Sequence, residues 1–317
     1  MISLRQHIFS LVAVFVALAI GIAAGSTVVR GPLLDSTRAR LESAEENIAL
    51  ERAENDALAA ELAQLDDWEV NGPAQLVSGR LAATGVLVMV VGAVDDDVVD
   101  GVLRTLRATS GAVLAQLRIA PAVFDPEAVE RVAAVLGVTP SEEVVPMEVF
   151  GERLATLVPP VVSAIEGKDG VVAGGFVRSA FGDLEDAGLV DLLDVNGEEL
   201  TVDTIEVLVL TDRNVANDPT PMLTGLIEMS DPAGANMAVL VSEVGRVGQD
   251  NETPAPSFVQ TIRDDGRLRD ELSTVDNAET ILGWVATVLG LEAARAGTVG
   301  HFGFRDGASD AIPERGS

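Results

Sequence analysis

The uncharged apolar run at the N-terminus constrains this chain more than any other feature. Ile8 to Ala24 reads IFSLVAVFVALAIGIAA, and the apolar stretch extended to Val29 is flanked by Arg5 and Arg30. About 20 residues are needed for a helix to cross a bilayer. A retained membrane anchor over residues 1–30 is therefore predicted. A cleaved signal segment is the competing interpretation, because small residues follow the run.

The charged residues on either side of the apolar run help to predict how the helix is oriented in the membrane. Arg30, Arg38 and Arg40 follow it, whereas Arg5 precedes it. A count of positive charges would place the large region in the cytoplasm. The short N-terminal tail followed by one apolar run and a long region is typical of export. We therefore expect a single-pass protein of the cell envelope, with its soluble domain outside the cytoplasm; inner and outer membrane are not distinguished.

A seven-residue repeat follows the anchor and predicts a coiled-coil stalk over residues 31–72. Gly31-Pro32 is expected to break the first helix, and Asn71-Gly72-Pro73 to end the second. From Leu34 to Trp68 such a helix would span about 50 Å. The alternative is an amphipathic helix packed on its own domain. The predicted dimer interface consists of Leu34, Leu41, Ile48, Asn55, Leu58, Leu62 and Leu65.

Asn55 is the informative residue of this interface. A single Asn at such a position costs stability but fixes the register and favours a parallel dimer. The charges beside the seam give mixed support, because Arg40 and Glu45 can pair between chains whereas Glu61 and Asp66 would repel. The predicted partners are thus a second copy of the chain, the membrane and an unknown envelope protein.

The region 73–300 predicts an α/β domain of Rossmann-like or flavodoxin-like type, with a parallel sheet and crossover helices. A flexible acidic tail is expected over 301–317. Strands are predicted at Val86–Val91, Ala112–Ile119, Gly170–Val177, Ile205–Leu210 and Met237–Val241. Helices are predicted from Asp95–Asp97 onward, at Pro126–Leu136 and at Ala278–Ala294.

Composition leaves little for catalysis or metal binding. The chain has no Cys, no Tyr and two His, with a net charge of −29. So acidic a surface disfavours nucleic acid as a partner. Asp95, Asp96 and Asp97 occupy the helix start that a nucleotide phosphate would need, and are interpreted as a cap. We predict no enzyme and no cofactor; for metal, only Met222, Met229 and His301 are weak candidates.

One loop stands out near the C-terminus. Ser273-Thr274-Val275-Asp276-Asn277 precedes the last predicted helix, where Ser, Asp and Asn are natural caps. In doubly wound folds, ligands bind at the carboxyl ends of the strands. Ser273, Thr274, Asp276 and Asn277 are therefore a candidate loop for a partner or ligand.

The two ends of the chain carry a family resemblance. MISLRQHIFSLVAVFVALAIGIAAGS and STVDNAETILGWVATVLGLEAARAGTVGHFG resemble the actinobacterial copper-transport outer-membrane protein family, the MctB family, which groups with SteB-like envelope proteins. The resemblance implies a role in copper efflux or tolerance, as channel or channel accessory, with copper as a transported ion. The alternative is a non-catalytic dimeric scaffold that presents its α/β domain to an envelope assembly or division partner. Strands buried between helices lack the alternation of a membrane barrel.

Overall fold

In the computed structural model, the chain divides into two compact units, Met1–Asp67 and Trp68–Ser317. The structure describes residues 4–125, 129–139, 146–166, 171–193, 199–213, 220–230, 237–245, 257–305 and 307–313. Each unit is described by itself below.

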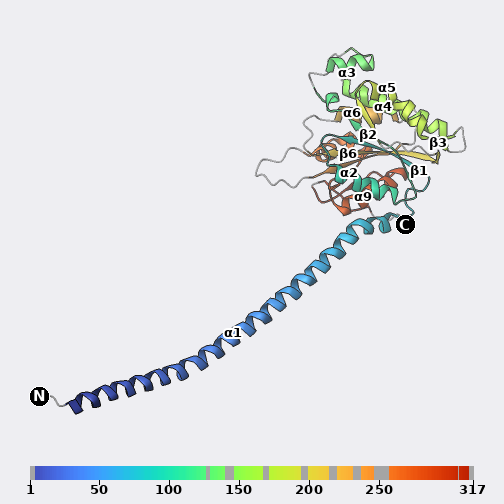
Figure 1. Ribbon diagram of the computed structural model, residues 1–317. Helices are drawn as coiled ribbons and strands as arrows, with labels where there is room; N and C mark the ends of the chain where they lie inside the picture. The colour runs from blue at the N-terminus through green and yellow to red at the C-terminus, as the bar shows by residue number, and fades with distance from the viewer. Residues whose placement is uncertain are drawn as a thin grey trace. The chain divides into compact units, whose positions relative to one another are not determined.

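Helix α1 covers Leu4–Val77 as one continuous helix (Figure 1). The predicted break at Gly31-Pro32 is wrong, and so is the predicted end at Asn71-Gly72-Pro73. A proline inside a helix removes one backbone donor and strains the preceding turn, and this usually kinks or ends a helix. Here the helical hydrogen bonding continues past both prolines.

The second unit contains a mixed α/β fold. Its elements after α1 are β1 (Thr84–Val91), α2 (Asp96–Arg107), β2 (Ala112–Ile119), a 3₁₀ turn (Pro121–Val123), α3 (Val129–Leu136), α4 (Pro146–Glu166), β3 (Val171–Ala173), α5 (Gly174–Asp186), β4 (Val190–Leu193), β5 (Glu199–Thr201), β6 (Thr204–Asp212), α6 (Thr220–Ser230), β7 (Val239–Val244), α7 (Phe258–Asp264), α8 (Gly266–Glu271), β8 (Ser273–Val275), α9 (Ile281–Arg295) and β9 (His301–Phe302).

A seven-stranded sheet is the frame of this unit. Its strand order is β4-β2-β1-β6-β7-β8-β9, and β4 alone of these strands runs antiparallel to its neighbour. Strands β3 and β5 form a separate antiparallel pair. The prediction of an α/β unit with a mostly parallel sheet is confirmed. Assignment to a named doubly wound fold stays a prediction.

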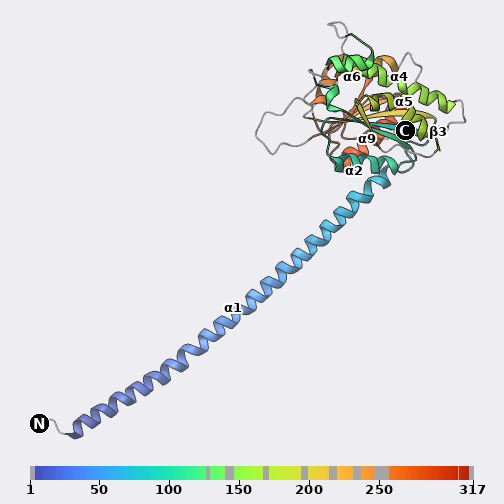
Figure 2. The ribbon, with the colours of Figure 1, turned by 45° about the horizontal axis from the view of Figure 1, so that its top comes forward.

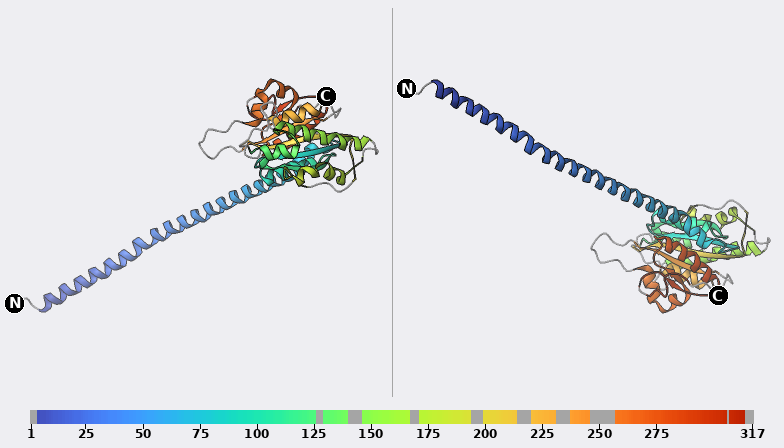
Figure 3. Two further views of the ribbon diagram at one scale, coloured as in Figure 1. Left: turned by 90° about the horizontal axis from the view of Figure 1, so that it is seen from above. Right: turned by 90° about the horizontal axis from the view of Figure 1, so that it is seen from below.

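Helices cover both faces of the sheet. Figures 1 and 2 show α4, α5 and α6 on one side and α2 and α9 on the other. Every residue of β1 is buried, as expected for a strand sandwiched between helices. In both views of Figure 3 the orange and red C-terminal segments gather at one side of the domain.

Side-chain packing shows which residues of the sheet face each layer of helices. Alternate residues of β6 point to opposite cores: Val207 and Val209 to the α4–α6 side, and Leu208 and Leu210 to the α2–α9 side. At the crossing of α4 and α6, a methyl group on Gly151 would overlap the carbonyl oxygen of Met222. The missing side chain therefore lets the two helix backbones touch.

Several predicted boundaries shift. The segment Gly170–Val177 is a strand only over β3, and its second half begins α5. Strand β7 starts two residues after the predicted Met237. Pro126 lies outside the described residues. Asp95 takes the predicted cap position of α2, but its side chain makes no capping hydrogen bond there. The cap of α9 is Thr280, whose side chain accepts a hydrogen bond from the Gly283 amide.

The C-terminal boundary also differs. A flexible tail was expected from residue 301, but His301–Phe302 form β9 and pair with β8. The ordered domain therefore extends past this boundary.

Candidate functional site

The candidate loop Ser273–Asn277 lies at the heart of a buried polar network. Its first three residues are strand β8, paired with β7 and β9. Ser273, Thr274, Asp276 and Asn277 are 1%, 0%, 1% and 5% exposed. Thr274 and Asp276 bind groups of the same chain, Ser273 also lines the pocket described below, and Asn277 Oδ1 has no hydrogen-bond partner among the described residues. Contact with a ligand or partner therefore stays a prediction for this loop.

Arg263 of α7 organises the network. Its Nη1 donates to Asp276 Oδ2 at 2.7 Å, its Nε to Thr274 Oγ1 at 3.0 Å, and its Nη2 to the Phe302 carbonyl at 2.9 Å. The side chains of Arg263 and Asp276 are 1% and 0% exposed. Burial of an ion pair is tolerated when hydrogen bonds also satisfy the remaining donors and acceptors, as these do.

Asp276 ties the C-terminal segment to the sheet. Its two oxygens accept hydrogen bonds from the amides of Phe304 at 2.9 Å and Arg305 at 3.1 Å. Gly303 has φ +131°, and a methyl group there would overlap the Asp276 carboxylate. Only glycine adopts this backbone readily. The segment therefore closes over the carboxyl end of β8.

Glu243 makes a second buried pair at the end of β7. This fully buried carboxylate accepts hydrogen bonds from Ser257 Oγ and from the Val259 amide, the latter at 3.0 Å. Arg305 Nη1 forms a short ion pair with it. The guanidinium lies over Gly245, where a side chain would collide with it. Segments far apart in sequence are thus joined at the carboxyl-terminal ends of the strands.

Of the three metal candidates, the structure describes the side chains of His301 and Met222, which have different surroundings. His301 Nδ1 lies 2.9 Å from Thr274 Oγ1, and its Nε2 lies 3.1 Å from the Arg269 carbonyl. Burial, with a smaller contribution from the charge of Arg263, lowers the pKa of His301. Met222 is instead fully buried in the core on the α4–α6 side. The side chain of Met229 lies outside the described residues.

A trio of carboxylates lies where α4 crosses α6. Oxygens of Glu148, Glu152 and Glu228 lie within 4.8 Å of one another. Glu228 also forms a 2.8 Å ion pair with Arg267. Such oxygen donors could hold a hard cation, but exposed acidic groups commonly cluster without one.

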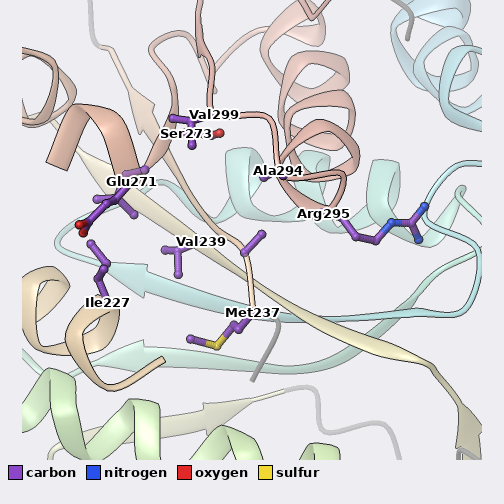
Figure 4. A pocket seen from close by; sticks show the side chains of 11 residues that line it. Ile227, Met237, Val239, Glu271, Ser273, Ala294, Arg295 and Val299 are labelled. Atoms are coloured by element: carbon purple, nitrogen blue, oxygen red, sulfur yellow. The ribbon is translucent and has the colours of Figure 1, made fainter. Parts of the chain in front are cut away.

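A pocket of about 210 Å³ lies at the opposite, amino-terminal edge of the sheet (Figure 4). It is lined by Ile227, Met237, Ala238, Val239, Glu271, Leu272, Ser273, Ala294, Arg295, Gly297 and Val299. In Figure 4, Met237 lies at the base of the pocket, Glu271 lies at one side, and the Arg295 guanidinium points away toward the other. Sequence reasoning looked for ligands at the carboxyl ends of the strands, where open α/β sheets usually bind them. Of the residues that line this pocket, Ser273 was predicted as a site residue.

Glu206 lies next to this pocket and is 0% exposed. Its Oε2 accepts a 2.9 Å hydrogen bond from the amide of Ala238, one of the pocket residues. Burial raises the pKa of Glu206 to about 7, against smaller lowering effects of the Ala238 amide and the Arg295 charge. One carboxylate at this edge therefore titrates near neutral pH.

Sequence reasoning missed the four charged residues that matter most in the domain core. Glu206 stands inside TIEVLVL and Glu243 inside VLVSEV. A carboxylate within an apolar strand is a usable signal, because a buried charge needs a partner. Arg263 and Arg305 carry no such signal, since their partners are set by the tertiary fold.

The first unit holds the predicted anchor and the predicted dimer interface. Among the described helices, Arg5–Gly25 is long and apolar enough to cross a membrane, with mean hydropathy 2.6. Leu41, Ile48, Leu58 and Leu62 are 58%, 47%, 50% and 60% exposed in the single chain, and Asn55 is exposed as well. The burial of Leu34 and Leu65 lies outside the described residues. Dimerisation stays a prediction.

Comparison with known proteins agrees with the resemblance at both chain ends. The family model described as copper transport outer membrane protein, MctB, matches residues 1–313. The proteins named copper transporter MctB of Mycobacterium tuberculosis (strain H37Rv) and Mycobacterium bovis are each 25% identical over 322 residues, covering 97% of this chain and 98% of the relative. That of Mycobacterium leprae is 25% identical, covering 98% of each chain. With nearly its whole length matched, candidate membrane helix and α/β unit included, this chain belongs to the MctB copper transport outer membrane protein family.

Proposed function

We propose that this protein supports copper efflux or copper tolerance at the cell envelope as an anchored, non-enzymatic accessory. Its family makes it a copper-transport-related protein, and the apolar helix Arg5–Gly25 fits a membrane anchor. The proposal places the α/β unit outside the cytoplasm, where an acidic surface of a chain with net charge −29 would attract cations.

The main observation that supports an accessory role is that helices cover the sheet. Lipid requires a spanning segment to satisfy its backbone internally and to face the hydrocarbon with apolar side chains. In the α/β unit the apolar faces of the sheet are turned inward: β1 and β7 are buried along their whole length beneath helices. This arrangement suits a domain in water that assists a transporter, rather than a domain that forms the conducting path itself.

The exposed apolar stripe of α1 supports a dimeric form of this accessory. Leu41, Ile48, Asn55 and Leu62 recur every seven residues, and about half of each of the three apolar side chains is exposed. A second copy in parallel register would cover them, with the Asn55 amides facing each other. Copper itself is a transported ion in this proposal and no resident cofactor.

The test is complementation of a strain that lacks the gene. The full chain, a chain shortened to begin at Gly31, and a chain with Leu58→Asp and Leu62→Asp are expressed at matched levels. We expect the full chain alone to restore growth at elevated copper, with zinc sensitivity unchanged as the metal control.

Cell length and septation in the same strains separate this proposal from its alternative. Restored morphology without any change in copper tolerance or copper content would contradict the copper role. It would favour instead a scaffold that presents the α/β unit to an envelope assembly or division partner.

A further inference from the structure

The connector between α1 and β1 has an unusual backbone. Gly79, Leu81 and Ala83 have φ of +77°, +48° and +55°. Leucine and alanine rarely adopt this left-handed region because Cβ crowds the backbone. Such residues persist only when their surroundings hold them. Leu81 is 1% exposed, so its side chain is one of the restraints.

Helix α9 holds the connector with two charged side chains. Glu292 forms a 2.7 Å ion pair with Arg80. One turn later, Arg295 Nη1 donates to the Ala82 carbonyl at 3.1 Å and to Thr84 Oγ1 at 2.6 Å. Side chains of α9 therefore contact the strained stretch and the start of β1 at three positions.

Arg295 also faces a competing acceptor. Glu206 points to the same side of the sheet as Leu208, the side that α9 covers. Arg295 lies close enough that its charge lowers the pKa of the carboxyl group. Within the described residues, Glu206 Oε1 has no hydrogen-bond partner, and the same holds for the buried Thr204 Oγ1 beside it. A buried acceptor with nothing to accept calls for an explanation.

Few other charges surround this carboxylate in the described chain. From α9 come Arg295 and Glu292, and Glu292 is engaged by Arg80 of the connector. Strand β1 and the residue before β7 bring neutral groups, Thr84 and the Ala238 amide. Just before its own strand, Asp203 is exposed. Arg295 is therefore the cation positioned to respond when Glu206 gains or loses its proton.

We propose that Glu206 and Arg295 form a proton-controlled clamp on the connector between α1 and β1. With Glu206 neutral, Arg295 binds Ala82 and Thr84 and holds the connector. With Glu206 charged, its Oε1 attracts the Arg295 guanidinium, which moves toward Glu206 past the amino-terminal ends of the strands. The connector then loses its hydrogen bonds to Arg295. Because Arg295 also lines the 210 Å³ pocket, the same movement changes the wall of that pocket. The inference does not depend on a copper role.

Hydrogen exchange of the full-length protein in detergent, followed by mass spectrometry, tests the clamp. The readout is the peptide containing the hydrogen-bonded amides of Arg80 and Thr84, which bond to Val77 and Leu81 carbonyls at 3.0 and 3.1 Å. Rates are corrected for intrinsic exchange at each pH. We expect protection to fall about tenfold between about pH 5.5 and about pH 8.5 in the wild type, as a hydrogen bond from a charged group is lost.

Three variants complete the experiment. Glu206→Gln should keep the connector protected at both pH values, and Arg295→Gln should leave it unprotected at both. Asp203→Asn, the matched change on the exposed carboxylate just before the same strand, should keep the wild-type transition. Thermal melts confirm that each variant is folded; if Glu206→Gln is not, the wild-type and Arg295→Gln results decide.

A wild-type connector equally protected at both pH values overturns the clamp. So does a transition that survives in Glu206→Gln, or full protection at low pH in Arg295→Gln.

Discussion

Arg263 Nη1 and Asp276 Oδ2 lie 2.7 Å apart with both side chains almost wholly buried, one on α7 and the other just after β8. The same aspartate binds the amides of Phe304 and Arg305. One carboxylate thus secures a helix, a strand end and the C-terminal segment.

Asp276→Asn should lower the free energy of unfolding by about 3–5 kcal/mol, because it leaves the Arg263 charge buried without its counter-ion. Chemical denaturation followed by circular dichroism measures the change. Asp270→Asn is the control: Asp270 is 74% exposed in its contact with Arg269, so we expect a change within about 0.5 kcal/mol. Equal effects of the two changes would contradict a structural role of the buried pair.

Gly151→Ala should destabilise the domain at the crossing of α4 and α6. The added methyl would overlap the Met222 carbonyl, and overpacking typically costs about 1–3 kcal/mol. Gly182→Ala in α5 is the matched control, because no atom lies within 4 Å of its new methyl. There alanine should stabilise by about 0.5–1 kcal/mol through helix propensity. Denaturation midpoints of both variants compare the two glycines; a stabilised Gly151→Ala would refute the close approach.

Glu206→Gln should stabilise the protein at alkaline pH and have little effect in acid. The pKa of Glu206 is raised from 4.5 to about 7, so the folded state holds this proton more tightly than the unfolded state. Stability from this group is therefore full below about pH 4.5 and is lost as pH rises to about 7. Above about pH 7 the variant should gain up to about 3 kcal/mol, at about 1.4 kcal/mol per pKa unit. Denaturation at several pH values measures this difference, and a gain independent of pH would contradict it.

A chain shortened to begin at Gly31 should leave the membrane fraction. The apolar helix Arg5–Gly25, with mean hydropathy 2.6, would then be missing. Ultracentrifugation and immunoblotting measure the distribution. Mass spectrometry of the full protein from membranes should find residues 4–25 still attached, whereas a mature N-terminus near Ser26 would identify a cleaved signal segment.

Residues 34–69 should drive parallel dimerisation through the stripe of Leu41, Ile48 and Leu62. Asn55→Leu should raise the thermal stability of the dimer and relax its choice of oligomer, because the buried amide no longer disfavours other assemblies. Sedimentation of the chain that begins at Gly31 measures the oligomeric state, and a thermal melt measures the stability. A monomer in the sedimentation measurement would show that α1 does not self-associate.

The local sequence pattern correctly predicted the secondary-structure elements that depend mainly on neighbouring residues. The unbroken apolar stretch VLVMVV predicted the strand that became β1, and Ala112–Ile119 matches β2 residue for residue. Pattern failed where local preference and packing compete. Gly31-Pro32 is typical of a helix break, yet α1 continues, and Gly174–Val177 has strand-like residues but begins α5.

The sequence by itself determined that this chain has one apolar segment of membrane length, a heptad stripe and buried parallel strands, because each follows from the hydrophobicity and spacing of adjacent residues. Tertiary structure alone decided which charges meet. Arg263 reaches Asp276, Arg305 reaches Glu243, and Arg295 reaches the connector across 211 positions of sequence, at Thr84. These pairs depend on strand order, since the parallel alignment of β6, β7 and β8 brings distant chain segments together at the two ends of the strands. Burial makes each pair important for stability, because a charge removed from water costs free energy unless it is paired. The local sequence pattern does not predict which residue forms the pair.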